Sequence, residues 1–153
     1  MVTWKYEESV KIIGIILLVI IGLIVLFFVY VALKPMVPKN YETKIETGGD
    51  IEAKYIVHGK YEVKYTEQGA MENYKKYEVY YPSELERNNK KYPVIVVNNG
   101  TGVKASKTRT MFEHFASWGF IVIDNEEEYS WNDFSAEMSL KYLLGHTKID
   151  TTC

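Results

Sequence analysis

The side chains that could serve as nucleophiles, bases or metal ligands are scattered along this sequence rather than grouped in motifs. His58, His114 and His146 are far apart and fall on different predicted elements. His114 lies within a predicted helix, so we expect a surface or partly packed residue rather than a base. The single cysteine, Cys153, has nothing in its surroundings to lower its thiol pKa. One cysteine also excludes a disulfide framework or a cysteine-based cluster, and we expect no metal and no cofactor.

Charged residues near the predicted strand ends allow several interpretations. The run Glu126–Glu128 follows a predicted strand and could form a metal site, although a solvated loop is the expected arrangement. Lys104, Lys107 and Arg109 share one predicted helical turn, which indicates a solvated face. Asp124 lies at the carboxyl end of a predicted strand, a position that faces the site in α/β sheets. Capping or loop hydrogen bonding is an equally open role for Asp124.

The elements that would position these residues begin with two buried strands. Residues 93–97 (Pro-Val-Ile-Val-Val) form a continuous apolar run, typical of a strand covered on both faces of a parallel sheet. The glycine-bearing loop 98–102 (Asn-Asn-Gly-Thr-Gly) follows directly. A helix capped by Ser106 and ended by Gly119 is expected next, because apolar residues recur at helical spacing. Residues 120–123 then predict a second buried strand.

A second helix and three strands complete the predicted domain. Ser130 and Asp133 fit an N-terminal capping pattern, and the helix beyond them is expected to bury Ala136, Leu140, Leu143 and Leu144. Apolar residues alternate with charged ones at 51–57, 61–65 and 77–81, which predicts half-exposed antiparallel strands. Residues 58–60 would link the first two as a hairpin. The expected fold class is α/β, with antiparallel strands leading into a parallel β-α-β-α unit.

The N-terminal part of the chain predicts a membrane anchor. No charge occurs from Ile12 to Leu33, and 22 residues of helix reach about 33 Å, enough to cross a bilayer core. A cleaved signal peptide has a shorter apolar region and a small-residue cleavage site. Lysines flank the run on both sides, so charge hardly sets the orientation. We expect the short tail inside the cell and the globular part outside the cell membrane.

The predicted domain organisation follows from these boundaries. Residues 1–11 are an N-terminal tail, 12–33 the transmembrane helix, 34–50 a linker rich in Pro, Gly and mixed charges, and 51–153 the globular domain. The net charge of -2 removes the electrostatic case for nucleic-acid binding. The lipid bilayer is the first expected partner.

Five segments, taken together, carry a family resemblance: residues 59–63, 80–82, 92–102, 115–123 and 139–143. From Gly59 to Leu144 the chain resembles the N-terminal half of an α/β-hydrolase. The similarity is greatest to the branch that holds dienelactone-hydrolase-like, chlorophyllase-like and cutinase-like polyester hydrolases. The fold class that this resemblance implies is a partial α/β-hydrolase sheet.

The resemblance implies a serine ester hydrolase whose oxyanion is held by two backbone N–H groups. One donor would come from Gly100-Thr101-Gly102, with Thr101 N–H as the expected group; a plain strand-to-helix turn is the alternative. Asp124 and Trp131 would border the substrate cleft, although an ordinary packing role is equally open for Trp131. The nucleophile should lie in G-x-S-x-G, followed by an acid and a histidine, and this motif is absent from the sequence. We therefore expect no ester hydrolysis by this chain alone.

Three hypotheses remain open from sequence. The chain is a membrane-anchored, shortened hydrolase-family product; or a non-catalytic tethered domain that binds protein or glycan through its Tyr-rich strands; or one half of a split hydrolase completed by a separate C-terminal half. An exposed edge of the sheet, formed by the predicted strands at 93–97 and 120–123, would also favour self-association.

Overall fold

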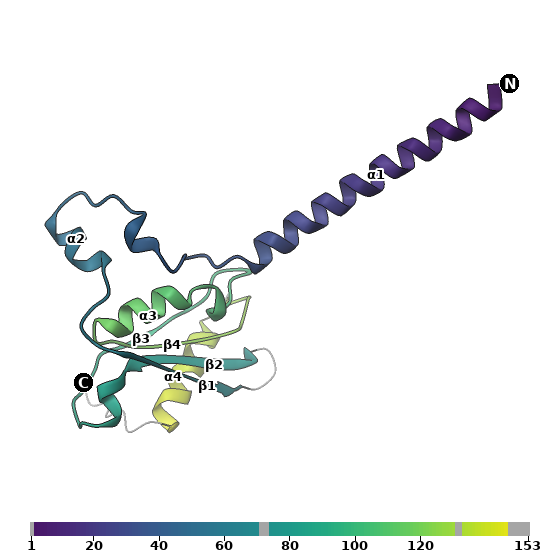
Figure 1. Cartoon of the computed structure of the whole chain (residues 1–153). Coiled ribbons are helices and arrows are strands. Elements are labelled where there is room, and N and C mark those ends of the chain that lie inside the picture. The colour runs from purple at the N-terminus through teal and green to yellow at the C-terminus, as the bar shows by residue number, and fades with distance from the viewer. Residues whose placement is uncertain (1, 71–73, 131–132, 147–153) are drawn as a thin grey trace. The chain divides into compact units, whose positions relative to one another are not determined.

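A computed structural model of the chain describes residues 2–70, 74–130 and 133–146. The chain divides into two compact units, Met1–Lys34 and Pro35–Cys153. Both are drawn in Figure 1, and each is described by itself.

The first unit is a single long helix, α1 (Val2–Leu33). Within its segment Glu7–Leu33, an 18-residue window has a mean hydropathy of 3.6 and no buried share. The predicted long apolar helix is therefore present and exposed. Its length and composition fit either a signal anchor or a signal sequence, because both place such a helix near the N-terminus.

The second unit is built on a four-stranded sheet of order β1-β2-β4-β3. The strands are β1 (Val63–Gly69), β2 (Lys76–Pro82), β3 (Val94–Val96) and β4 (Ile121–Asn125). β1 pairs antiparallel with β2, β2 antiparallel with β4, and β3 parallel with β4. The predicted mixed α/β character, with antiparallel strands leading into a parallel pair, is confirmed.

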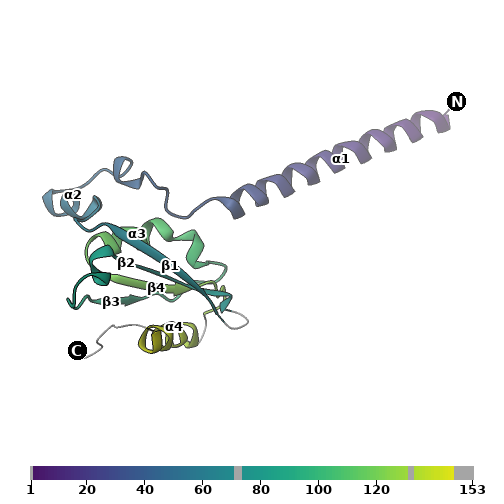
Figure 2. The ribbon, with the colours of Figure 1, turned by 60° about the horizontal axis from the view of Figure 1, so that its bottom comes forward.

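Helices cover both faces of this sheet, as Figure 2 shows for α3 (Arg109–Ser117) and α4 (Phe134–His146). On the α3 face, Tyr80 and Val122 pack with Phe112. On the α4 face, Ile121 and Ile123 pack with Leu143. Successive residues of β4 point to opposite faces, which explains why this strand is buried along its whole length.

The strand predicted at 51–57 is wrong, because this segment forms the helix α2 (Asp50–Ile56). The alternation also places Ile51 and Tyr55 four residues apart, on one side of a helix. Among the described residues no strand pairs with the segment, and α2 buries none of its residues. The predicted hairpin at 58–60 is consequently wrong as well, and the sheet begins at Val63.

The start of α3 differs from its prediction, whereas its end agrees. The residue that precedes α3 is Thr108, which makes no side-chain capping bond. Ser106 lies instead in the short 3-10 turn η4 (Ala105–Lys107), where its backbone N–H and Oγ both bond the Glu126 carboxylate. Gly119 ends the helix as predicted, with a φ of +99°, a conformation that favours glycine.

The apolar face predicted for α4 is wrong at two of its four residues. Leu140 and Leu144 are 41% and 49% exposed, whereas Ser135, Ser139 and Leu143 are buried. Asn125 at the end of β4 explains this reversal, because its Nδ2 donates to Ser135 O and Ser139 Oγ, and Ser135 Oγ donates to its Oδ1. The predicted cap at Ser130 is also wrong, since the helix begins at Phe134.

Candidate functional site

The loop after β3 and the loop after β4 meet at the carboxyl ends of the parallel strand pair. Asn99 joins them: its side chain is 7% exposed, and its Nδ2 donates to Asp124 Oδ1 at 3.0 Å and to Asn125 O at 2.8 Å. Gly102 N–H donates to Glu128 O at 2.8 Å. The two loops are thus tied together by bonds to both backbone and side chains.

The backbone of Gly100-Thr101-Gly102 forms a tight turn in which two donors, Gly100 N–H and Thr101 N–H, have no acceptor among the described residues. Val103 N–H closes the turn by donating to Gly100 O at 3.0 Å, and Gly102 has a φ of +73°. A side chain at this φ would be strained, so the turn requires glycine here. Gly100, Thr101 and Gly102 are exposed. Among the described residues, no acceptor binds Thr101 N–H, so this group can donate to a ligand.

Asp124 lies beneath this loop and is fully buried. Its Oδ1 accepts from Asn99 Nδ2 and from Asn125 N–H, whereas its Oδ2 has no partner within the described residues. Burial raises the pKa of the Asp124 carboxyl to about 8, and the nearby Glu126 and Glu78 add to the effect. Asp124 therefore holds a proton at neutral pH and supports the loop through Asn99. Trp131, the other predicted cleft residue, lies outside the described residues.

The charged residues that the sequence placed on solvated surfaces are partly buried and paired. Glu78 on β2 is opposite Asp124 in the sheet register and fully buried. Arg109 donates to it from Nε at 3.1 Å and Nη2 at 2.6 Å, and Lys76 Nζ lies 2.9 Å from its Oε1. Glu126, predicted in a solvated loop, is only 7% exposed because it holds the turn at Ser106. Arg109 thus neutralises a buried carboxylate.

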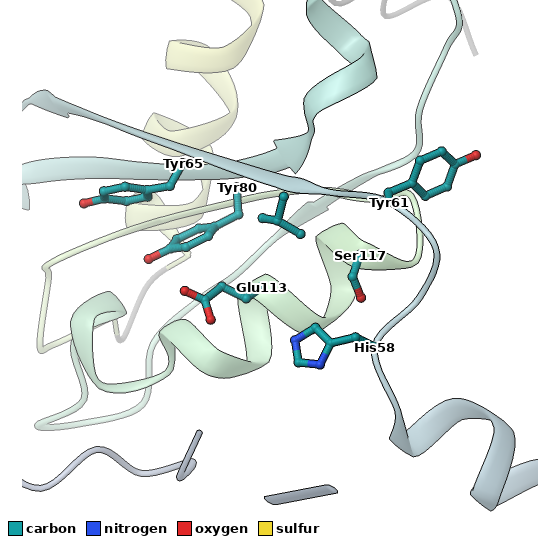
Figure 3. A pocket seen from close by; sticks show the side chains of 7 residues that line it. His58, Tyr61, Tyr65, Tyr80, Glu113 and Ser117 are labelled. Carbon is teal, nitrogen blue, oxygen red and sulfur yellow. The ribbon is translucent and has the colours of Figure 1, made fainter. Parts of the chain in front are cut away.

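A separate pocket of about 280 Å³ lies between β1, α3 and the segment that precedes β1. Figure 3 shows its lining side chains, which include a serine and a histidine: His58, Tyr61, Val63, Tyr65, Tyr80, Glu113 and Ser117. Ser117 Oγ is already engaged, because it donates to His114 O at 2.6 Å and accepts from Gly59 N–H at 2.8 Å. Its hydroxyl therefore holds the chain in place and is no candidate nucleophile.

His58 and His114, which the sequence places on different elements, come together beside this pocket. Their ring centroids are 5.6 Å apart with the planes at 67°. His58 Nδ1 bonds Glu42, and His114 Nδ1 bonds the Tyr41 hydroxyl. The expectation that His114 is partly packed is confirmed, but its partners were missed. A sequence separation of 56 residues (114 minus 58) leaves no local signal that could have revealed them.

A search for metal-binding groups and two comparisons with known proteins complete the description of the site. In the parts of the chain that the structure describes, no group of three or more His, Cys, Asp or Glu residues is arranged to hold a metal ion. No protein-family model matches the chain, and a search of curated proteins finds no match.

Proposed function

We propose that residues 51–153 are the N-terminal part of a serine-hydrolase-type α/β domain that acts on carboxylic esters, and that loop 100–102 supplies its oxyanion donor. The observation that carries this proposal is the open Thr101 N–H, held in a glycine turn directly after the third strand. The oxyanion donor of α/β-hydrolases comes from this loop, between the third strand and the first helix of the sheet.

The topology beside the loop supports the same assignment. α3 and α4 cover opposite faces of the sheet, and parallel crossovers are right-handed in about 98% of cases. The connection through α3 runs from β3 to β4, so a connection through α4, on the other face, must run in the opposite direction, from β4 toward β3. The position next to β4 on that side is already occupied by β3. The next parallel strand would pair with the free edge of β3. Ligands of open α/β sheets bind at such a reversal of strand order.

The chemistry that we propose for the completed domain uses an acyl-enzyme. A serine Oγ on the added strand attacks the ester carbonyl carbon and passes its proton to a histidine. The oxyanion receives hydrogen bonds from Thr101 N–H and from the N–H of the residue after the serine. The alcohol leaves with that proton, and water then hydrolyses the acyl-serine. This chain contributes one donor and the strands that position it, and its sequence holds no G-x-S-x-G serine.

The long apolar helix α1 supports the finer proposal on location. We infer a single-pass anchor in the cell membrane, with the tail of residues 1–11 inside and the sheet domain outside. Carbonate washing of membranes checks this proposal: the full chain should stay in the pellet, and deletion of residues 1–34 should release it. Recovery of the intact chain in the supernatant would contradict the anchor.

The decisive experiment asks whether an added G-x-S-x-G segment restores activity. The coding sequence that follows the Cys153 codon is searched for this motif. The encoded segment is co-expressed with the full chain, and the two are assayed together in detergent. We expect fluorophosphonate labelling of the added serine and hydrolysis of p-nitrophenyl butyrate by the pair only. Thr101→Pro removes the donor N–H and should lower kcat/KM about 10²–10³-fold. Thr101→Ala keeps the N–H and should leave kcat/KM nearly unchanged.

Two outcomes would contradict this proposal. The first is fluorophosphonate labelling of the chain alone. Ser130 is the first serine to substitute in that case, because its Oγ is buried without a partner among the described residues, in the loop after β4. The second is equal activity of the Thr101→Pro and Thr101→Ala chains when each is combined with the added segment. That result would favour the interpretation of loop 100–102 as a plain strand-to-helix turn.

A further inference from the structure

A docking segment, residues 36–61, runs along α3 before the chain enters the sheet. Met36 N–H donates to Lys107 O at 3.0 Å near the start of α3, and Tyr61 N–H donates to Ser117 O at 3.0 Å at its end. Trp118 Nε1 donates to Val57 O at 2.9 Å. This segment is the covalent connection between α1 and the sheet domain, so whatever holds it on α3 sets the length of free chain between them.

Tyr41 is the buried side chain that the docking segment places on α3. Tyr41, in the 3-10 turn η1 (Tyr41–Thr43), is 8% exposed and is the buried residue of this turn. By contrast, α2 buries no residue, and Ile51 is 76% exposed. A seven-residue helix with so little packing has low intrinsic stability. Segments with few buried contacts open locally at low free-energy cost, so the contacts of Tyr41 add substantially to the backbone bonds and the Tyr55–Trp118 ring contact that hold this segment.

Tyr41 docks against two histidines. Its ring lies 5.6 Å from His114 and 6.4 Å from His58, centroid to centroid, and its hydroxyl bonds His114 Nδ1. Burial raises the pKa of the Tyr41 hydroxyl to about 12, so this group keeps its proton and donates it to an unprotonated Nδ1. A protonated Nδ1 cannot accept that bond. The buried hydroxyl would then lose its acceptor, which is costly inside a packed contact.

The surroundings of docked His114 also disfavour its protonation. Burial, together with the neighbouring His58, lowers the pKa of His114 below its usual value. The backbone of Tyr55 and the carboxylate of Glu42, which bonds His58, act in the opposite direction but do not reverse this shift. Released His114 therefore binds its proton more tightly than docked His114. Docking is favoured above about pH 6.5, the ordinary pKa of histidine, and weakens as the pH falls through the lower pKa of the docked state.

We propose that Tyr41, Glu42, His58 and His114 form a pH-sensitive latch that holds the docking segment on α3 at neutral pH and releases it in acid. The groups that face His114 are His58, Tyr41 and Glu42 from the docking segment, the backbone of Tyr55 from α2, and the ring of Phe115 from α3. Glu113 precedes His114 and lines the same pocket as His58. This inference is independent of the proposed ester hydrolysis.

Hydrogen exchange of the full chain in detergent micelles tests the latch. Protection factors of peptides within residues 36–61 are compared at pH 7.5 and pH 5.5, after correction for intrinsic exchange. We expect a three- to tenfold loss of protection at pH 5.5, since one proton shifts the equilibrium at most about tenfold per pH unit. Peptides from β2 and β4 should keep their protection.

Substitutions separate the latch from general acid effects. His114→Phe keeps a ring and removes the titrating group, so the pH dependence in residues 36–61 should disappear. Tyr41→Phe removes the hydroxyl and should lower protection of the segment already at pH 7.5. His146→Gln, in α4 on the opposite face of the sheet, is the matched control and should behave as the natural chain. An unchanged pH dependence in His114→Phe, or a parallel loss of protection in β2 and β4, would overturn the proposal.

Discussion

Asp124 shows how one buried carboxyl can support a loop. Its Oδ1 holds Asn99 and thereby the turn that presents Thr101 N–H, while its Oδ2 has no partner among the described residues. A charged carboxylate in this position would lack both water and a counter-ion, a costly state in a protein interior. The raised pKa, about 8, follows from that environment, and makes the stability of the domain depend on pH.

Asp124→Asn should remove this pH dependence. The native state binds one proton at Asp124 between about pH 4 and pH 8, whereas the unfolded state does not, so stability falls as the pH rises through that window. The slope for one proton is about 1.4 kcal/mol per pH unit. Asparagine mimics the protonated acid, so we expect the loss of stability between pH 6.5 and pH 8 to disappear and the variant to be more stable at pH 8. Urea unfolding of the full chain at pH 5, 6.5 and 8 measures the difference.

The control for Asp124→Asn is Glu137→Gln. Glu137 forms an exposed pair with Lys141 on α4, and such a pair contributes about 0.3–0.5 kcal/mol. This variant should keep the pH profile of the natural chain. Parallel profiles for the natural chain and Asp124→Asn would mean that Asp124 is already ionised below pH 7.

At the scale of elements, glycines fix how the docking segment meets α3. Gly59 approaches so closely that an added Cβ would lie 2.2 Å from Ser117 O, and its N–H donates to Ser117 Oγ. The three nearest atoms are all backbone atoms of Ser117 and Trp118, so no flexible group can move aside. The segment before β1 can therefore sit against the end of α3 only with glycine at position 59.

Gly59→Ala should destabilise the domain by about 1–3 kcal/mol, the usual cost of overpacking. Gly69→Ala is the matched control, because Gly69 lies in β1 with open space around its Cβ position. We expect a lower urea midpoint for Gly59→Ala and little change for Gly69→Ala. Equal midpoints for the two variants would show that residues 58–60 shift without cost.

The type of an element, helix or strand, was predictable from sequence where the apolar residues follow one clear pattern. The strand at Ile121–Asn125 is found buried as predicted, because tertiary packing and local pattern agree there. The run at 93–97 also forms a strand, but β3 is exposed to half-buried rather than covered on both faces, because it lies at the edge of the sheet. The segment 51–57 fits both a strand and a helix, and only the absence of a neighbouring strand decides between them. The buried face of α4 could not be predicted either, because the Asn125 side chain hydrogen-bonds Ser135 and Ser139 and so turns these serines, rather than the leucines, toward the sheet.

The candidate site was predictable in part for the same reason. Loop 98–102 follows its strand in sequence, so local pattern locates it and gives its glycines a role. The bond from Asn99 to Asp124 and the contact between His58 and His114 join residues that are distant in sequence. Such contacts depend on how the loops and the docking segment pack, which no local period encodes.

For the sheet domain as a whole, the two edges of the sheet differ in character. β1 carries Lys64 and Glu67 and is largely exposed, and charges of this kind discourage pairing with another chain. β3 is wholly apolar. Val97 N–H donates to Ile123 O, and Ile121 N–H donates to Pro93 O. Backbone groups alternate in direction along a strand, so those of Val94 and Val96 face the free edge.

We therefore expect the full chain to self-associate through β3 in mild detergent. Val94 is 36% exposed, and lysine at this position would place like charges against each other when two copies pair edge to edge. Val94→Lys should raise the concentration for half-association about two- to fivefold, the range expected for one unfavourable cross-strand pair. Gln68→Lys, on the exposed edge of β1, is the matched control and should not change it. Sedimentation velocity measures both, and α1 is present in each variant, so association through the apolar helix cancels from the comparison. Identical association of the natural chain and Val94→Lys would place self-association elsewhere and leave the β3 edge free for the strand of a hydrolase domain.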